Sequence, residues 1–261
     1  TAPAANTSFF AILLGSDNGG TVTPTDGSVT GDKLASNIAI ATTADASFGS
    51  KVGVNTTHPA SGAGLDKFIE VQGGDPGVVL RDDTASDAVE LYNAGGNFIV
   101  YTGSADAFKI DSAGHITKPL QSAFHVDPST DQNNFGQNPD AWVNVVFGTE
   151  VFDQNADFAS NTFTAPVTGR YFLNAVVRLN SVDEAANYYW LRLNTSNRII
   201  YGTLYDLDGL GSDPNYWALT VCALTDMDAN DTVTLDIIQN GGTIQTDVDG
   251  SGTHFSGFLA C

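Results

Sequence analysis

Basic residues are scarce in this chain of 261 residues, which has 10 Lys and Arg against 30 Asp and Glu and a formal net charge of −20. An acidic surface repels phosphate backbones, so the composition excludes nucleic acid as a partner. It favours solubility and cation binding instead, and the repulsion grows with every further copy in an oligomer.

Cysteine and long apolar runs are also scarce. Cys222 and Cys261 are the only cysteines, too few for a disulfide framework. The longest apolar run, SFFAILLG at residues 8–15, is too short to cross a bilayer. No basic flank of the kind found in signal peptides precedes it, and we predict no membrane insertion.

Motifs of catalysis are missing. The four histidines are scattered, and none has a metal-ligand spacing such as H-x-H or H-E-x-x-H. No G-x-S-x-G elbow, P-loop or dinucleotide fingerprint occurs. We therefore predict that the chain is not an enzyme. A polysaccharide-cleaving solenoid, whose paired carboxylates carry no local motif, is the alternative. The histidines are His58, His115, His125 and His254.

Glycine and short polar turn formers are abundant, with 27 Gly, which predicts an all-β chain with many turns. Three regions of the chain differ in their sequence patterns. Residues 1–48 hold the apolar run, predicted as a buried strand or as a docking segment. Residues 49–118 alternate short strands with turns, and residues 119–261 carry longer strands.

The middle region has strands too short to bury a face alone, so we expect several chains to wrap around one axis. VGVNTTHP at residues 52–59, with the later ELYNAGGNFIVY and FKIDSAGHI, resembles shaft segments of bacteriophage tail fibres. This resemblance implies a short, intertwined, trimeric, β-prism-like shaft over residues 49–118, carried by an N-terminal anchor at residues 1–48.

Ten strands can be recognised in residues 119–261, enough for a two-sheet jelly roll. Aromatic residues recur at fixed intervals around a Pro and a Gly, and FSGFLA at 255–260 closes the region. The pattern resembles the globular-head family of the first complement component, which is tumour-necrosis-factor-like. The matching residues are Phe147, Glu150, Phe152, Asp153, Phe163, Pro166, Gly169, Tyr171 and Phe172.

This second resemblance implies a ten-stranded jelly-roll head and a homotrimer. Collagen-like repeats, which precede many heads of the family, are absent here. The family's strand order also separates the strands of Cys222 and Cys261 by a third strand, roughly 9–10 Å. That distance exceeds the roughly 7 Å limit for a disulfide, so we predict that they are not bonded to each other.

Residues 232–238 alternate, which predicts Val233, Leu235 and Ile237 in the core and Thr232, Thr234 and Asp236 in water. Residues 216–224 and 172–177 are apolar on both sides, so a neighbouring protomer is expected to cover one of them. The predicted trimer-interface residues are Phe172, Trp217, Phe255 and Phe258.

Acid-rich loops near the end of the head begin with the same sequence pattern as many calcium-binding loops, in which alternating carboxylates converge on one side of a tight turn. None ends in the bidentate Glu of an EF-hand, and solvated turns are the alternative interpretation. Heads of the family often bind calcium, so Ca²⁺ is the one candidate cofactor. The candidate ligands are Asp206, Asp208, Asp213, Asp247 and Asp249.

Aromatic residues beside amides suit the stacking and hydrogen bonding of a sugar, and loops are where recognition evolves. The alternative is that these aromatics pack in the core or between protomers. Trp190, Tyr201 and Trp217 belong to the same group of aromatics. The candidate receptor-binding residues are Tyr188, Tyr189, Asn194, Asn197, Arg198, Tyr205 and Tyr216.

Together these patterns predict a homotrimeric virion fibre, such as a phage tail fibre, whose head binds a glycan or protein on the host cell surface. Its N-terminal segment would bind other virion proteins, so the location would be the virion or the extracellular space. The alternatives are a purely structural capsid or neck fibre, with the head as a trimerisation cap, and a secreted bacterial adhesin.

Overall fold

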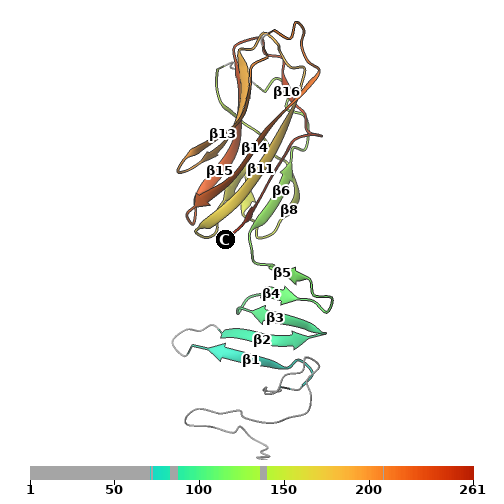
Figure 1. The fold of residues 1–261 in the computed structure, drawn as a ribbon, viewed down its shortest axis with the longest axis vertical. Coiled ribbons are helices and arrows are strands. Elements are labelled where there is room, and N and C mark those ends of the chain that lie inside the picture. The colour runs from blue at the N-terminus through green and yellow to red at the C-terminus, as the bar shows by residue number, and fades with distance from the viewer. Residues whose placement is uncertain (1–70, 72, 83–87, 136–139, 208) are drawn as a thin grey trace, which may run out of the picture. The chain divides into compact units, whose positions relative to one another are not determined.

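A computed structural model describes residues 71, 73–82, 88–135, 140–207 and 209–261 (Figure 1). All of them lie in the second of the chain's two units, Glu70–Cys261. The predicted anchor at residues 1–48 and the first part of the predicted shaft lie outside the described residues. Every regular element that is described is a strand, which confirms the all-β fold class. Among these residues there is no helix long and apolar enough to span a membrane.

The first five strands form one sheet in chain order, and each strand is antiparallel to its neighbours (Figure 1). A two-residue turn joins the second and third strands. Its Gly95 and Gly96 both have positive φ, 57° and 80°, which is the geometry that hairpins of this length require. The strands are β1 (Gly77–Arg81), β2 (Ala88–Ala94), β3 (Asn97–Tyr101), β4 (Asp106–Ile110) and β5 (Ile116–Thr117).

The following strands form a sandwich of two six-stranded sheets. One sheet has the order β13-β12-β15-β10-β9, with β7 beside β15. The other has the order β14-β11-β17-β6-β8, with β16 beside β11. Neighbours far apart in sequence, such as β6 and β17, give the strand order of a jelly roll, as predicted.

Ten strands are predicted in the head and twelve are observed, and the two-residue β16 is one of the additional strands. The strands are β6 (Ala123–Asp127), β7 (Val143–Asn144), β8 (Thr149–Asp153), β9 (Phe158–Ala159), β10 (Thr162–Thr164), β11 (Gly169–Asn180), β12 (Tyr188–Thr195), β13 (Ile199–Tyr205), β14 (Tyr216–Met227), β15 (Thr232–Asn240), β16 (Asp247–Val248) and β17 (His254–Leu259).

The core of the head lies between the two sheets. Alternate residues of β11, from Tyr171 to Leu179, are fully buried, as alternation in a half-buried strand requires. Aromatic rings fill one end of the core. Phe124 stacks on Phe163 at 4.7 Å between ring centroids and meets Phe255 edge to face at 5.0 Å.

The alternation of β15 is confirmed for the core side, where Val233, Leu235 and Ile237 are fully buried. The prediction that Asp236 faces water is wrong, since only 6% of it is exposed. The register of β12 and β15 places Arg192 directly opposite Asp236, and their side chains meet at 2.9 Å. A cross-strand partner thus replaces water around this carboxylate.

The two cysteines are both free and exposed, which confirms that they are not bonded to each other. Cys222 lies on β14, and Cys261 follows β17 at the end of the chain. Strand β11 lies between β14 and β17 in the sheet, as the family's strand order predicted.

Candidate functional site

The first candidate surface is one side of the five-stranded sheet, which we call the apolar face. The register aligns Val78, Leu91, Val100 and Phe108 across four strands. Alternation adds residues two positions away, and Asn93 is the single polar residue among them. The apolar face consists of Val78, Leu80, Val89, Leu91, Phe98, Val100, Phe108, Ile110 and Ile116.

Within the described part of the chain, four of these side chains are half-buried and the other five are exposed. Between 38% and 59% of each of Val78, Leu80, Val89, Phe98 and Ile116 is exposed. A monomeric soluble protein seldom exposes an apolar patch this continuous, and such patches usually mark a contact with another protein.

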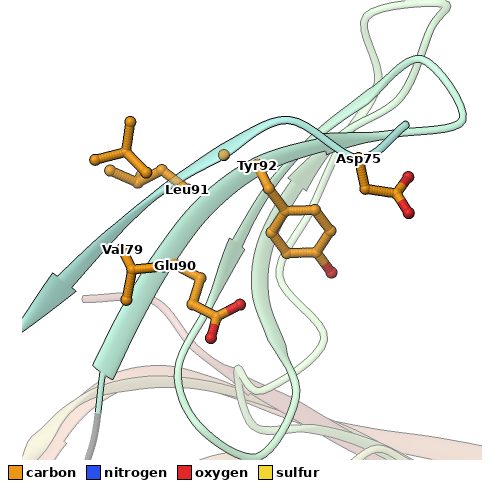
Figure 2. Close-up of a pocket in the computed structure, with 7 residues that line it drawn as sticks. Asp75, Val79, Glu90, Leu91 and Tyr92 are labelled. Carbon is orange, nitrogen blue, oxygen red and sulfur yellow. The ribbon is translucent and has the colours of Figure 1, made fainter. Parts of the chain in front are cut away.

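The opposite side of the same sheet is mixed in character. Figure 2 shows Leu91 on one side of the paired strands and Val79, Glu90 and Tyr92 on the other. The register places Arg81 and Lys109 on the side of Glu90 as well, together with Ile99, which is 5% exposed. The two sides therefore differ in charge: the apolar face has no charged residue, and the opposite, more polar side combines charged with apolar side chains.

The second candidate surface is the outer side of the sheet that contains β11, which we call the phenylalanine–histidine face. Phe172 lies beside Leu224 on one neighbouring strand and beside Phe258 on the other, and its ring is 5.5 Å from that of Phe258. A groove runs along these rings. The face consists of His125, Phe152, Phe172, Leu224, His254 and Phe258, four of which line the groove.

Two histidines that lie 129 positions apart meet on this face. The rings of His125 and His254 stack at 5.5 Å with an interplanar angle of 14°. His125 Nε2 also lies 3.2 Å from an oxygen of Asp127. Burial, and secondarily the nearby charge of His125, hold the pKa of His254 below its ordinary value of 6.5. No spacing along the chain indicates this pair, because β6 and β17 become neighbours only in the folded sheet.

We expect the histidine pair to make stability fall as the pH drops below about 6.5. Above that value His254 is neutral in the folded and unfolded states, so its full contribution is present. As the pH falls, the unfolded chain takes up a proton that the folded chain resists, so stability is lost through the lowered pKa. Carboxylates with lowered pKa values, such as Asp213 and Asp231, change the stability of the fold only at more acidic pH.

The measurement is the melting temperature between pH 7.5 and 5.0, for the natural chain and for His254→Gln. The variant should lose less stability over this interval, since it has no imidazole at this position. An identical pH dependence in both proteins would contradict the prediction.

The third candidate surface lies on the other sheet, which we call the tryptophan platform: Trp142, Tyr188, Trp190, Arg192 and Tyr201. Trp190 and Tyr201 stack at 4.0 Å between ring centroids, and Trp142 lies 6.0 Å from Trp190. The guanidinium of Arg192 lies 4.0 Å from the ring centre of Trp142. Sequence reasoning did not single out Trp142, which precedes a two-residue strand and has no local pattern.

The candidate receptor-binding residues do not gather at one place. Tyr188 and Asn194 lie near opposite ends of β12, and six residues of strand span roughly 20 Å. Asn197 donates to Asp231, in the turn before β15, at 3.0 Å, and Arg198 donates to Asp226, near the end of β14, at 2.8 Å.

Three further tyrosines of that prediction have different surroundings. The prediction is wrong for Tyr189, which is fully buried, because its hydroxyl is bound to Thr246 at 2.7 Å inside the core. Tyr205 meets Trp217 edge to face, at 5.2 Å. Tyr216 is 60% exposed on the second sheet, with Arg178 over its ring at 4.6 Å.

The predicted trimer-interface residues divide in a similar way. Phe172 and Phe258 lie on the phenylalanine–histidine face. Phe255 is fully buried against Phe124, so its assignment to an interface is wrong: alternation along β17 turns it inward. Trp217 is partly buried and packs against the core of the head.

The candidate calcium ligands are used within the fold. Asp249 is buried and binds Arg178 at 2.9 Å, while Asp247 accepts a hydrogen bond from the amide of Asn134. Asp213 accepts hydrogen bonds from Glu184 and Gln245, which lower its pKa. Asp206 is exposed, and Asp208 lies outside the described residues. In the described ranges no three His, Cys, Asp or Glu side chains come together to hold a metal ion.

Comparisons with known proteins cover about half of the chain. No family model and no curated protein matches the chain. The globular domain of zebrafish complement 1qA protein is 18% identical, with a TM-score of 0.39 over 54% of this chain and 98% of that one. A crystal structure of murine APRIL at pH 5.0 is 12% identical, with a TM-score of 0.38 over 53% and 98%.

Proposed function

We propose that the chain is a homotrimeric virion fibre protein whose head attaches to the surface of a host cell, with a glycan as the receptor class. The main observation in favour of assembly is the apolar face, in which nine apolar side chains lie on one side of one sheet. The resemblance of residues 49–118 to tail-fibre shafts supports the fibre role.

Other copies of this chain suit the apolar face better than its own N-terminal segment does. Five strands at about 4.8 Å spacing make the face about 19 Å wide. The longest apolar run outside the described residues, at residues 8–15, is long enough for a single strand only, and one strand is much narrower than this face. A second copy brings a face of the same width and character. Sheets whose apolar sides meet pack about 10 Å apart, which removes these side chains from water.

Three copies are favoured over two by the head. The residues that carry its resemblance to complement-type heads imply a threefold arrangement, and the phenylalanine–histidine face supplies a second uncovered apolar surface. Burial of both faces offsets the repulsion between three chains that each carry a net charge of −20.

A binding role is proposed in preference to catalysis. The histidines that the fold brings together stack on a flat sheet, beside Phe152 and Ser256. Acyl transfer needs a nucleophile hydrogen-bonded to its base, whereas the hydroxyl of Ser256 donates to the carbonyl of Asn174 at 3.4 Å. The proposed location is the virion or the extracellular space, with the N-terminal segment bound to other virion proteins.

The first test is the mass of the full chain in solution by multi-angle light scattering, expected at three times the 27.3 kDa of one chain. The second is saturable labelling of cells from a panel of bacterial strains by fluorescent protein, with competition by the unlabelled protein. A monomer would refute the assembly. A trimer that labels no strain would refute attachment, and the purely structural fibre would replace it.

A further inference from the structure

Two of the chain's three tryptophans lie outside the core of the head. On β12 the residues that face the core are Tyr189, Leu191 and Leu193, all fully buried. Trp190 is on the opposite side of the strand by alternation, and Trp142 lies 6.0 Å from it. Burial in the core therefore does not explain these two large rings.

The rings of the tryptophan platform form one continuous group. Trp190 and Tyr201 are nearly parallel, with 19° between their planes, and Trp142 lies about equally far from both, at 6.0 and 6.1 Å. Tyr188 meets Trp190 edge to face at 6.4 Å. Tyr201 is 48% exposed, so the group is open to a ligand from the solvent side.

Hydrogen bonds hold the platform in place. Arg192, which covers Trp142, donates from Nε and a terminal nitrogen to Asp236 at 3.0 and 2.9 Å. The other oxygen of Asp236 accepts from Asn144 at 3.1 Å and Thr234 at 3.0 Å. Trp190 donates its indole N–H to the carbonyl of Gly202. Side chains already fixed in this way lose little conformational entropy when a ligand binds.

We propose that the tryptophan platform is a binding site for neutral carbohydrate, with a pyranose ring lying against Tyr201 and the adjoining indoles. The C–H bonds on one face of a pyranose suit the negative face of an aromatic ring. The hydroxyl groups at its edge suit amides and hydroxyls. The register places Asn194 opposite Thr234 on the same side of the sheet as Trp190, and opposite Ile199, two positions from Tyr201, so such groups lie beside the Tyr201 end of the platform and away from Tyr188.

The charges of the platform and of the whole chain favour neutral over acidic carbohydrates. The one cation of the platform, Arg192, is already paired with Asp236, and only 15% and 8% of their side chains are exposed. The chain as a whole carries a net charge of −20, which repels sialylated and uronic-acid glycans. This inference rests on the proposed attachment function for its biological role, and three platforms on one trimer would raise the avidity for a repetitive cell surface.

The test uses the full chain on an array of neutral and acidic oligosaccharides, with bound neutral ligands then titrated while tryptophan emission is followed. Emission should change on binding, because two of three tryptophans belong to the platform. Tyr201→Leu keeps an apolar side chain but removes the ring, and it should weaken binding roughly tenfold or more. Val151→Ala, at an exposed residue of the other sheet that belongs to none of the candidate binding residues, is the control and should bind like the natural chain.

Absence of neutral-glycan binding by the natural chain would overturn the proposal, as would equal binding by Tyr201→Leu with its melting temperature unchanged. Cell labelling separates the two levels of inference. If the natural chain and Tyr201→Leu label cells equally, attachment stands and the platform fails, which includes the case of a protein receptor. If the chain binds a neutral glycan through Tyr201 and labels no cells, the platform stands and attachment fails.

Discussion

Replacing Leu91 by lysine is expected to convert the proposed trimer into a monomer. Leu91 lies within the apolar face, with Val78 opposite on one neighbouring strand and Val100 on the other. In the trimer the substitution would bury three ammonium groups without partners. Each unpaired buried charge costs about 3–5 kcal/mol, and the three together exceed what assembly at micromolar concentration can offset.

The matched control is Val79→Lys, which places the same charge on the polar side of the same sheet. Val79 is 53% exposed and lies opposite Glu90, so its ammonium gains a partner. Light scattering should give the mass of one chain for Leu91→Lys and of three chains for Val79→Lys. A trimeric Leu91→Lys with an unchanged melting temperature would show that the apolar face is not the contact between copies.

Replacing Phe124 by alanine is expected to cost about 3–5 kcal/mol of the free energy of unfolding. Phe124 is 1% exposed and contacts the rings of Phe158, Phe163 and Phe255, at 5.3, 4.7 and 5.0 Å. Because these rings come from three other strands, no single movement closes the cavity. A loss of this size is a large part of the roughly 5–15 kcal/mol that stabilises a typical domain.

Urea unfolding followed by tryptophan emission measures this loss. Val151→Ala is the control, since Val151 is 57% exposed on β8, the strand beside β6, and its replacement should change stability by less than about 0.5 kcal/mol. A loss below about 1 kcal/mol for Phe124→Ala would mean that the neighbouring phenylalanines collapse into the space.

Local pattern was sufficient where a single strand or turn sets the outcome. The buried side of β15 followed from alternation, because successive side chains of a strand point to opposite faces. The predicted alternation of short strands and turns in residues 49–118 is seen at Gly95 and Gly96, where glycine's backbone freedom allows positive φ. The unbonded cysteines followed from the strand order that the family resemblance supplied.

Local pattern failed where the partner comes from elsewhere in the chain. The alternation of its strand predicts that Asp236 faces solvent. Its side chain instead pairs with Arg192 of the adjacent strand, which shields it from water. The polar neighbours of Tyr189 in the sequence predict an exposed aromatic residue. Its hydroxyl is instead hydrogen-bonded to the hydroxyl of Thr246 in the core. In both cases a hydrogen-bonding partner that is distant in sequence removes the cost of burying a polar group.

The sequence by itself determined the all-β class and the apolar side of β15, because these depend on alternation and turn chemistry within a few residues, whereas β11 and β14 are apolar on both sides in the sequence. The tertiary structure alone decided which strands are neighbours. That choice created the apolar face, the stack of His125 on His254 and the meeting of Trp142 with Trp190. Side chains on different strands come within contact distance only when the register of the whole sheet is set, and no spacing along the chain encodes that register.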